Sequence, residues 1–295
     1  MENLDYRALA VLDAVASHGS FDKAASALGI SQPAVSQRIK ALEDAAGRLL
    51  IVRGSPAVPT GLGQRLISHY RSVKLMEASL DIDLGNVVSM PEISVAVDAA
   101  SLATWFPLAL PPLLSPPRCQ LDVRSLEDGA ARHLLREGGV FGCVAAGPVA
   151  EAKGASSMPL GAMRYVCVAT PVFAGHWFGD GFMREAVPLA PSVVHDRELM
   201  RSFLREHLAF EGAFPHHTLP LSTALNDTLF GGLAYGLLPY LQAAHALSQG
   251  QLVDLAPGAY IDVPLYWHAW ELDTPFTRAL AEQVITTARR YLVQP

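Results

Sequence analysis

Apolar and polar positions alternate with a helical period in three short segments at the start of the chain. The pattern predicts helices over residues 4–17, 21–28 and 32–46. Gly29 lies between the second and third helices, where a glycine can take the left-handed conformation that a tight turn needs. Ser31 is placed to cap the third helix. Two helices joined by so short a turn are typical of a helix-turn-helix.

The third predicted helix has an apolar face and a polar face. Val35, Ile39 and Leu42 fall within about 60° of one another on a helical wheel, so we expect them to pack inward. The predicted DNA contacts are Ser31, Gln32, Pro33, Ser36, Gln37, Arg38 and Lys40. Glutamine can pair with adenine, serine with either kind of base edge, and arginine with guanine or phosphate; Arg38 lies nearer the buried face and is assigned to phosphate. The alternative is an ordinary three-helix unit with a solvated polar face.

The segment LLIVRGSPAVPT, residues 49–60, has the pattern of an apolar strand, a turn and a return strand. Such a hairpin next to a helix-turn-helix predicts a wing. Arg53 lies at its tip, where it could enter the minor groove, because narrow A/T tracts attract arginine.

A longer helical pattern follows over residues 60–84. Its apolar positions recur every three or four residues, with the acidic Glu77 as the single break: Leu62, Leu66, Tyr70, Val73, Leu80 and Leu84. This spacing favours the seam of a two-stranded coiled coil, which would pair two DNA-binding heads. A helix packed along its own domain is the alternative.

Beyond residue 91, strand-like and helix-like segments alternate. Predicted strands are ISVAVD, CQLDVRSL, VFGCVAA, MRYVCVA, APSVVH and VPLYWHAW, and predicted helices lie near 101–114, 128–137, 197–208, 223–235 and 274–292. Alternation of this kind predicts α/β units with largely parallel sheets, whose ligands bind beyond the carboxyl ends of the strands. The expected domains are therefore residues 1–59, a linker over 60–90, and a ligand-binding body over 91–295.

Composition and charge agree with this division. The chain is 51% hydrophobic and 17% charged, which fits folded domains rather than disorder. Its net charge is −6, but residues 1–80 hold nine Lys/Arg against seven Asp/Glu, so the excess of acid lies in the body. With no run of eighteen apolar residues and no signal-peptide pattern, we expect a soluble, cytoplasmic protein without a membrane contact.

Motifs for catalysis, metals and cofactors do not emerge from the sequence. Cys119, Cys143 and Cys167 are far apart, and two of them lie in apolar segments, so we interpret them as core residues. There is no Walker loop, GxGxxG, GxSxG or HExxH. His216 and His217 are adjacent and would not share a helical face. We therefore expect no catalytic residue, no metal site, no cofactor and no enzyme activity.

The run FDKAASALGISQPAVSQRIKALEDAAGRLLIVRG resembles the signature of LysR-type transcriptional regulators. In that resemblance, residues 60–84 match the linker helix, and the matches to the usual DNA-contacting positions are Gln32, Pro33, Ser36, Gln37 and Arg53. The resemblance implies a winged helix-turn-helix, a linker helix, and a periplasmic-binding-protein-like effector domain of two Rossmann-like subdomains. It also implies a homodimer or homotetramer assembled through the linker and the effector domain, with double-stranded DNA as a partner and RNA polymerase as a candidate one.

Further stretches resemble the ArgP/LysG branch of that family, whose members sense basic amino acids and control their export. They are DYRAL…LDAV near the N-terminus, SLATW at 101–105, GQLVDLAPG at 250–258 and LYWH at 265–268. The branch often has an acidic residue just before SLATW, whereas Ala100 stands there and Asp98 lies two residues earlier. The resemblance implies a regulator controlled by lysine or arginine. A different effector, or an architectural DNA-binding protein without a ligand, is the alternative, and a solute receptor would leave the first 84 residues unexplained.

Candidate effector contacts follow three predicted strands of the body: Asp98, Ser101, Thr104, Glu127, Asp128, His195 and Asp196. Hydroxyl groups and free backbone N–H groups at a helix start can hold a carboxylate, and paired carboxylates can bind a cationic side chain. Each of these residues also fits the simpler role of a helix cap or of an acid near a helix N-terminus.

Overall fold

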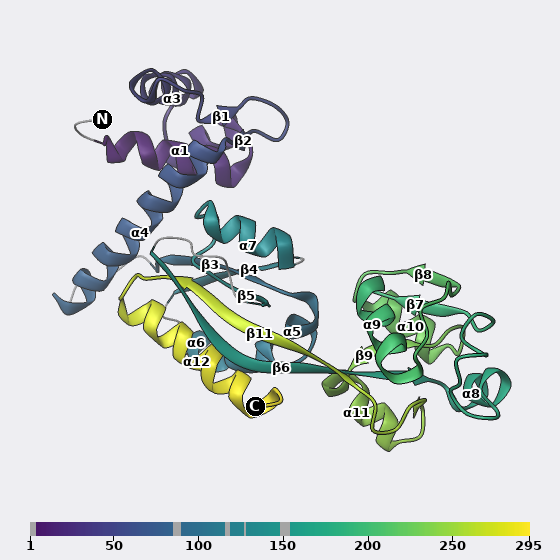
Figure 1. The fold of residues 1–295 in the computed structure, drawn as a ribbon. Coiled ribbons are helices and arrows are strands. Elements are labelled where there is room, and N and C mark those ends of the chain that lie inside the picture. Colours follow the sequence, from purple (N-terminus) through teal and green to yellow (C-terminus); the bar gives the residue numbers. More distant parts are fainter. Residues whose placement is uncertain (1–3, 85–89, 116–118, 127, 148–153) are drawn as a thin grey trace.

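A computed structural model describes residues 4–84, 90–115, 119–126, 128–147 and 154–295, with only the backbone described at residues 82, 83 and 128. Figure 1 shows a small helical head, a long helix that leaves it, and a body of two lobes joined by two long strands. This mixed α/β arrangement confirms the predicted fold class. Among the described residues, no helix is both long enough and apolar enough to cross a membrane.

The head contains the three predicted helices and a small wing. Its elements are α1 (Tyr6–His18), α2 (Phe21–Leu28), α3 (Gln32–Ala46), β1 (Ile51–Val52) and β2 (Val58–Pro59). Gly29 ends α2 with φ at 65°, and the Ser31 hydroxyl accepts the Ala34 N–H at 3.4 Å to begin α3. Leu9 and Leu12 of α1 are fully buried against α3, so the head has a core of its own. The helix-turn-helix prediction is confirmed.

Helix α4 (Gly61–Asp83) connects the head to the body. The Thr60 hydroxyl accepts the Gly63 N–H at 3.1 Å and so caps the helix. Ile67 near its start packs in the core of the head, whereas Leu75 belongs to the core of the body. The helix therefore packs along both parts of its own chain while extending past them (Figure 1).

Lobe one is built on parallel strands, as predicted. Its strands are β3 (Glu92–Val97), β4 (Gln120–Ser125) and β5 (Gly142–Ala146), covered by α5 (Ala99–Ala103), η1 (Phe106–Ala109), α6 (Pro111–Leu114), α7 (Asp128–Arg136) and α12 (Pro275–Tyr291). The single helix predicted over 101–114 is wrong: Pro107 and Pro111 divide it into short pieces, because proline lacks a backbone donor and clashes with the preceding turn.

Two long antiparallel strands, β6 (Ala155–Ala169) and β11 (Ile261–Trp270), run from one lobe to the other (Figure 1). They join the main sheet into seven strands, in the order β10-β6-β11-β5-β3-β4, with β9 also paired to β6. The expectation of largely parallel sheets is therefore wrong for this central pair. Strand β6 also begins eight residues before the predicted MRYVCVA segment, because its exposed first half lacks an apolar pattern.

Lobe two also has strands that alternate with helices, and its strands are shorter. Its elements are α8 (Pro171–Trp177), β7 (Ser192–Val194), α9 (Arg197–Leu208), β8 (His216–Thr218), α10 (Thr223–Phe230), β9 (Gly236–Pro239), α11 (Tyr240–Ser248) and β10 (Val253–Asp254). Helix α10 ends at Phe230 rather than 235, because Gly231 and Gly232 follow and Gly232 has a φ of 67°. Cys119, Cys143 and Cys167 are all buried, as predicted.

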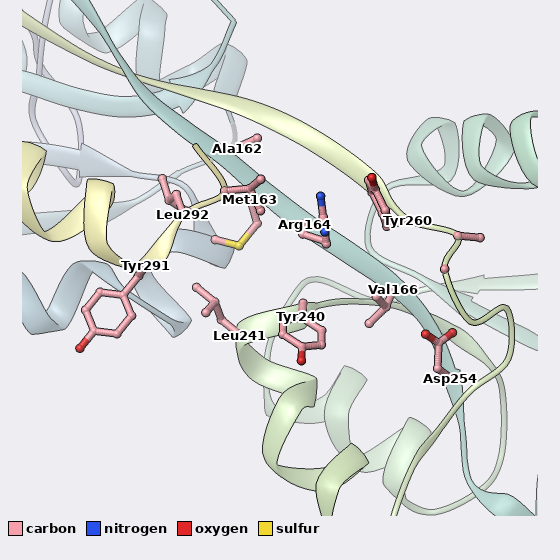
Figure 2. A pocket seen from close by; sticks show the side chains of 13 residues that line it. Ala162, Met163, Arg164, Val166, Tyr240, Leu241, Asp254, Tyr260, Tyr291 and Leu292 are labelled. Carbon is pink, nitrogen blue, oxygen red and sulfur yellow. The ribbon is translucent and has the colours of Figure 1, made fainter. Parts of the chain in front are cut away.

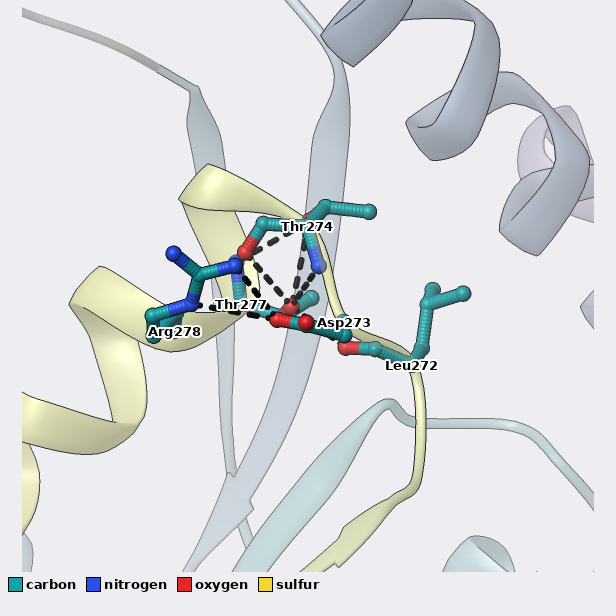
Figure 3. A network of polar contacts seen from close by, with 5 residues as sticks. All are labelled: Leu272, Asp273, Thr274, Thr277 and Arg278. Carbon is teal, nitrogen blue, oxygen red and sulfur yellow. Dashed lines mark hydrogen bonds and ion pairs between the residues drawn. The ribbon is translucent and has the colours of Figure 1, made fainter.

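Helix α12 returns the chain to lobe one and begins with a buried capping box (Figure 3). The Thr277 N–H donates to the Thr274 hydroxyl at 3.2 Å, and the Thr274 N–H donates to the Thr277 hydroxyl at 3.0 Å. Next to this box, Arg278 pairs with Asp273 at 2.8 Å. The reciprocal bonds satisfy two backbone groups that a buried helix start would otherwise leave unpaired.

Candidate functional site

Helix α3 presents one polar face to solvent. Val35 and Ile39 are fully buried and Leu42 is 5% exposed, so the apolar face packs inward as predicted. Gln32 lies in the first turn on the opposite side, where its side-chain amide donates to the Ser36 hydroxyl at 3.2 Å. Of the other predicted contacts on this helix, those with exposed side chains are Pro33, Gln37, Arg38 and Lys40.

Arg53 of the wing joins this surface. It lines one shallow hollow together with Gln32 and Ser36 of α3 and with Phe21 at the start of α2. Its guanidinium lies 5.4 Å from the centroid of the Phe21 ring, which favours a cation–π contact. The fold therefore brings wing and helix residues that are some twenty positions apart in the sequence to one exposed patch with hydrogen-bonding groups.

Glu43 is a positioning residue that the sequence pattern did not single out. Its carboxylate accepts the backbone N–H groups of Leu50 and Ile51 at 2.8 and 3.2 Å. These bonds tie the end of α3 to the first strand of the wing and so fix Arg53 relative to the helix. The signal in the sequence was the LE pair in the run that resembles the LysR signature.

In the body, the carboxyl ends of two sets of strands point toward each other. Strands β3, β4 and β5 run in the same direction as β6, and β7, β8 and β9 run against it. Because β6 passes from lobe one to lobe two, both sets end at the junction between the lobes, which we call the inter-lobe site. Ligands of α/β proteins bind beyond such strand ends.

On the lobe-one side, the predicted hydroxyl groups have partners inside the protein. Asp98 rather than Ser101 caps α5, since its carboxylate accepts the Ser101 N–H at 2.9 Å. Ser101 is fully buried and its hydroxyl accepts the indole N–H of Trp105 at 3.0 Å. The Thr104 hydroxyl donates to the Ala100 carbonyl at 2.6 Å. Their role as effector contacts stays a prediction.

On the lobe-two side, His195 follows β7 and stacks on Tyr165 of β6, with ring centroids 5.4 Å apart and an angle of 17° between the planes. Burial lowers the pKa of His195, so the neutral imidazole is favoured. Asp196 caps α9 by accepting the N–H groups of Glu198 and Leu199 at 2.8 and 3.1 Å. Glu127 lies outside the described residues, and of Asp128 only its place at the start of α7 is described.

Arg132 and His268 were not predicted as site residues: Arg132 stands in no motif, and His268 ends the LYWH stretch at 265–268, to which no role was assigned. Arg132 of α7 donates a hydrogen bond to the Ala146 carbonyl at the carboxyl end of β5, which places a cation near the inter-lobe site. His268 of β11 is fully buried, and its Nδ1 lies 2.7 Å from the Ser157 hydroxyl. Burial, with a smaller effect of the Arg132 charge, lowers the pKa of His268 to about 4.

Comparison with known proteins identifies the family. Residues 6–64 match the family model for the bacterial regulatory helix-turn-helix protein, lysR family. The HTH-type transcriptional regulator ArgP of Pseudomonas aeruginosa strain PAO1 is 41% identical over 300 residues, which cover 98% of each chain. The protein is a member of the LysR family. Its named relatives are transcriptional regulators, in agreement with the expectation that it is not an enzyme.

Solved structures extend the family resemblance over the whole chain. ArgP from Mycobacterium tuberculosis has a TM-score of 0.85 at 34% identity and covers 99% of both chains. Full-length LysG from Corynebacterium glutamicum with bound effector Arg has a TM-score of 0.74 at 31% identity and covers 99% of this chain and 100% of that one. Head, linker helix and two-lobed body are therefore similar to those of ArgP and LysG over nearly the whole of this chain.

Proposed function

We propose that this LysR-family protein is a cytoplasmic transcriptional regulator that binds a two-fold-related DNA site and responds to arginine or lysine. The observation that carries the proposal is the full-length similarity to ArgP proteins and to LysG with bound effector Arg. Control of amino-acid export is the regulatory role that the sequence resemblance implies, and it stays a prediction.

The DNA contact rests on the exposed face of α3. Its first turn would enter the major groove with Gln32 and Ser36 leading, while Arg53 approaches the backbone or the minor groove. The test is the double variant Gln32→Ala and Ser36→Ala in footprinting at fixed salt. We expect it to lose its preference for the cognate site over random DNA, because base contacts rather than phosphate contacts carry specificity. Gln249→Ala, an exposed glutamine in lobe two, is the matched control; unchanged specificity in the double variant would refute the assignment.

The effector would bind at the inter-lobe site. Arg132 lies at the carboxyl end of β5 and would attract the α-carboxylate of an amino acid, and the acidic residues at the strand ends would hold its cationic side chain. Isothermal titration of the full-length protein should show binding of L-arginine or L-lysine but not of citrulline, which has the shape of arginine without its charge. If neither basic amino acid binds, the protein responds to a different effector or to none.

Dimerisation is proposed to use the free end of α4. Three apolar side chains one turn apart, Met76, Leu80 and Leu84, are 46%, 59% and 67% exposed in the single chain. Leu80 and Leu84 belong to the predicted seam, whereas Met76 does not; their own chain leaves all three uncovered, and a second copy of the helix would bury them. Leu80→Glu should lower the oligomeric state in sedimentation velocity, whereas Lys74→Ala on the same helix should not; an unchanged oligomer for Leu80→Glu would place the interface elsewhere.

A further inference from the structure

The two faces of β6 meet different surroundings. Side chains alternate along a strand, so Tyr165 and Cys167 point to one side and Arg164 and Val166 to the other. The Tyr165 side meets His195 at the inter-lobe site. The Arg164 side lines a separate cavity of about 540 Å³, which we call the rear groove (Figure 2).

Both lobes contribute to the rear groove. Lobe two supplies Tyr240 and Leu241 from the start of α11, and lobe one supplies Tyr291 at the end of α12. In Figure 2, Tyr291, Leu241 and Tyr240 follow one another along one side of β6, with Asp254 farther along that side and Tyr260 across the strand from Tyr240. A molecule in the groove would therefore touch elements that belong to different lobes.

The rear groove has a net negative charge, because Arg164 is neutralised by an ion pair with Asp262 and Asp254 remains. Arg164 is bound by both oxygens of Asp262 at 2.9 and 2.8 Å, and its guanidinium lies 3.5 Å from the centroid of the Tyr260 ring. Its charge is thus neutralised within the protein. The Asp254 carboxylate has one hydrogen bond from the described residues, from the Ala256 N–H at 3.0 Å, and faces the groove without a cationic partner there. Burial raises the pKa of Asp254, because it removes part of the hydration of the carboxylate.

The remaining lining suits an organic cation with a short carbon chain. Tyr240 is 47% exposed and its ring is open to a ligand, whereas one face of the Tyr260 ring is already covered by Arg164; aromatic faces attract ammonium and guanidinium groups. Val166 and Leu241 add apolar surface for a methylene chain. No uncommitted cation among the described lining residues is available for a carboxylate, because Arg164 is already paired.

We propose that the rear groove is a second small-molecule site, which binds an aliphatic amine or guanidine that lacks a carboxylate, with Asp254 as its ion-pair partner and Tyr240 against its chain. Such a ligand has the side-chain chemistry of a basic amino acid without the α-carboxylate. Because the groove spans α11 and α12, ligand binding would depend on the angle between the lobes and would couple to the inter-lobe site. The coupling rests on the proposed effector function; the binding site itself does not.

The test is isothermal titration of the full-length protein with cadaverine and with agmatine. Asp254→Asn keeps the acceptor for the Ala256 N–H and removes the charge, so we expect binding to weaken by roughly tenfold to a hundredfold, as for the loss of a charge-assisted hydrogen bond. Tyr240→Ala, on an exposed helix start, should also weaken it. Asp180→Asn makes the same substitution at an exposed position of lobe two away from the groove lining and should leave binding unchanged.

The proposal is overturned if the wild-type protein binds neither amine at millimolar concentration. It is also overturned if Asp254→Asn and Tyr240→Ala leave binding intact while circular dichroism shows all variants folded. Titration in the presence of arginine separates this site from the inter-lobe site. If the sites are separate but coupled, the apparent amine affinity reaches a plateau as the arginine concentration is raised. If the two ligands share one site, the apparent amine affinity falls without limit as the arginine concentration is raised, and the proposal is refuted. If arginine does not bind, the effector proposal fails and the amine titration still tests the rear groove.

Discussion

The head and the body use polar side chains in opposite ways. In the head, Gln32, Gln37 and Lys40 lie exposed on one side of a rigid three-helix core, with few contacts inside the chain. In the body, Ser101, Thr277 and His268 are buried and bonded to other groups of the protein. The head therefore offers exposed polar groups to a partner, whereas the hydroxyl groups on the lobe-one side of the inter-lobe site are already bonded within the protein.

The difference predicts that substitutions in the body act first on stability, and those on α3 act first on binding. The largest effect is expected at Trp105, which is fully buried between α5 and η1. Trp105→Ala should lower the free energy of unfolding of the body by about 3–5 kcal/mol, because it removes a large apolar side chain and leaves a cavity. Urea denaturation followed by circular dichroism measures it. A decrease of less than about 1 kcal/mol in the free energy of unfolding would show that the body tolerates a cavity between α5 and η1.

A second prediction concerns acid pH. The pKa of His268 is lowered from 6.5 to about 4 by burial, so between these values the unfolded chain binds a proton that the folded protein excludes. This contribution to stability is complete above pH 6.5 and is lost as pH falls toward 4, by roughly 3 kcal/mol at most. His195 acts in the same direction.

The pH effect is measured by thermal unfolding between pH 4 and 7.5, with His268→Gln as the comparison. The variant keeps a hydrogen-bonding side chain for Ser157 and cannot titrate, so its stability should depend less steeply on pH. An equal slope in wild type and variant would assign the acid sensitivity to other groups.

The head could be predicted from the sequence almost residue by residue, since its signals are local. Ser31 and Gly29 mark helix ends through bonds to residues within one turn, and the face of Val35 and Ile39 follows from the helical period alone. The body was predicted less well. The exposed first half of β6 has no apolar alternation, because its position depends on β11, about a hundred residues away in the chain. The sequence pattern does not show that pairing.

The candidate sites follow the same division. Gln32, Ser36 and Arg53 were found from a contiguous signature, and the fold brings them together. Tyr165, Arg132 and Asp254 were not predicted as site residues. Tyr165 and Asp254 gain their places only when segments distant in sequence become neighbours, and Arg132 when α7 packs against the strand that follows it. Ser101 and Thr104 were placed correctly after a strand, yet their hydroxyl bonds to Trp105 and Ala100 depend on side-chain packing that no spacing encodes.

A third prediction compares the same substitution in the two regions. Ser101→Ala should cost about 1–3 kcal/mol of stability, because the buried indole N–H of Trp105 loses its acceptor. Ser36→Ala on α3 should change stability by less than about 0.5 kcal/mol, since its partner Gln32 is exposed to water, while it weakens cognate DNA binding. Thermal unfolding measures the change in stability of both variants, and DNA titration measures their affinity for the cognate site. Equal costs for the two serines would contradict the distinction drawn between head and body.

The smallest difference between the body and the head is expected at two helix caps. Thr274 begins α12 at 1% exposure, and Thr274→Ala removes the acceptor of the Thr277 N–H, which water cannot replace; the expected cost is about 1–2 kcal/mol. Ser31 begins α3 in an exposed position, so Ser31→Ala should cost less, about 0.5 kcal/mol, because water can take the place of the hydroxyl. Thr274→Ser should restore most of the loss, as it keeps the oxygen that closes the box in Figure 3. If both alanine variants lost the same free energy of unfolding, burial would not explain the difference between the two caps. That result would contradict, for these two helix starts, the contrast between polar groups exposed to water in the head and polar groups bonded inside the body.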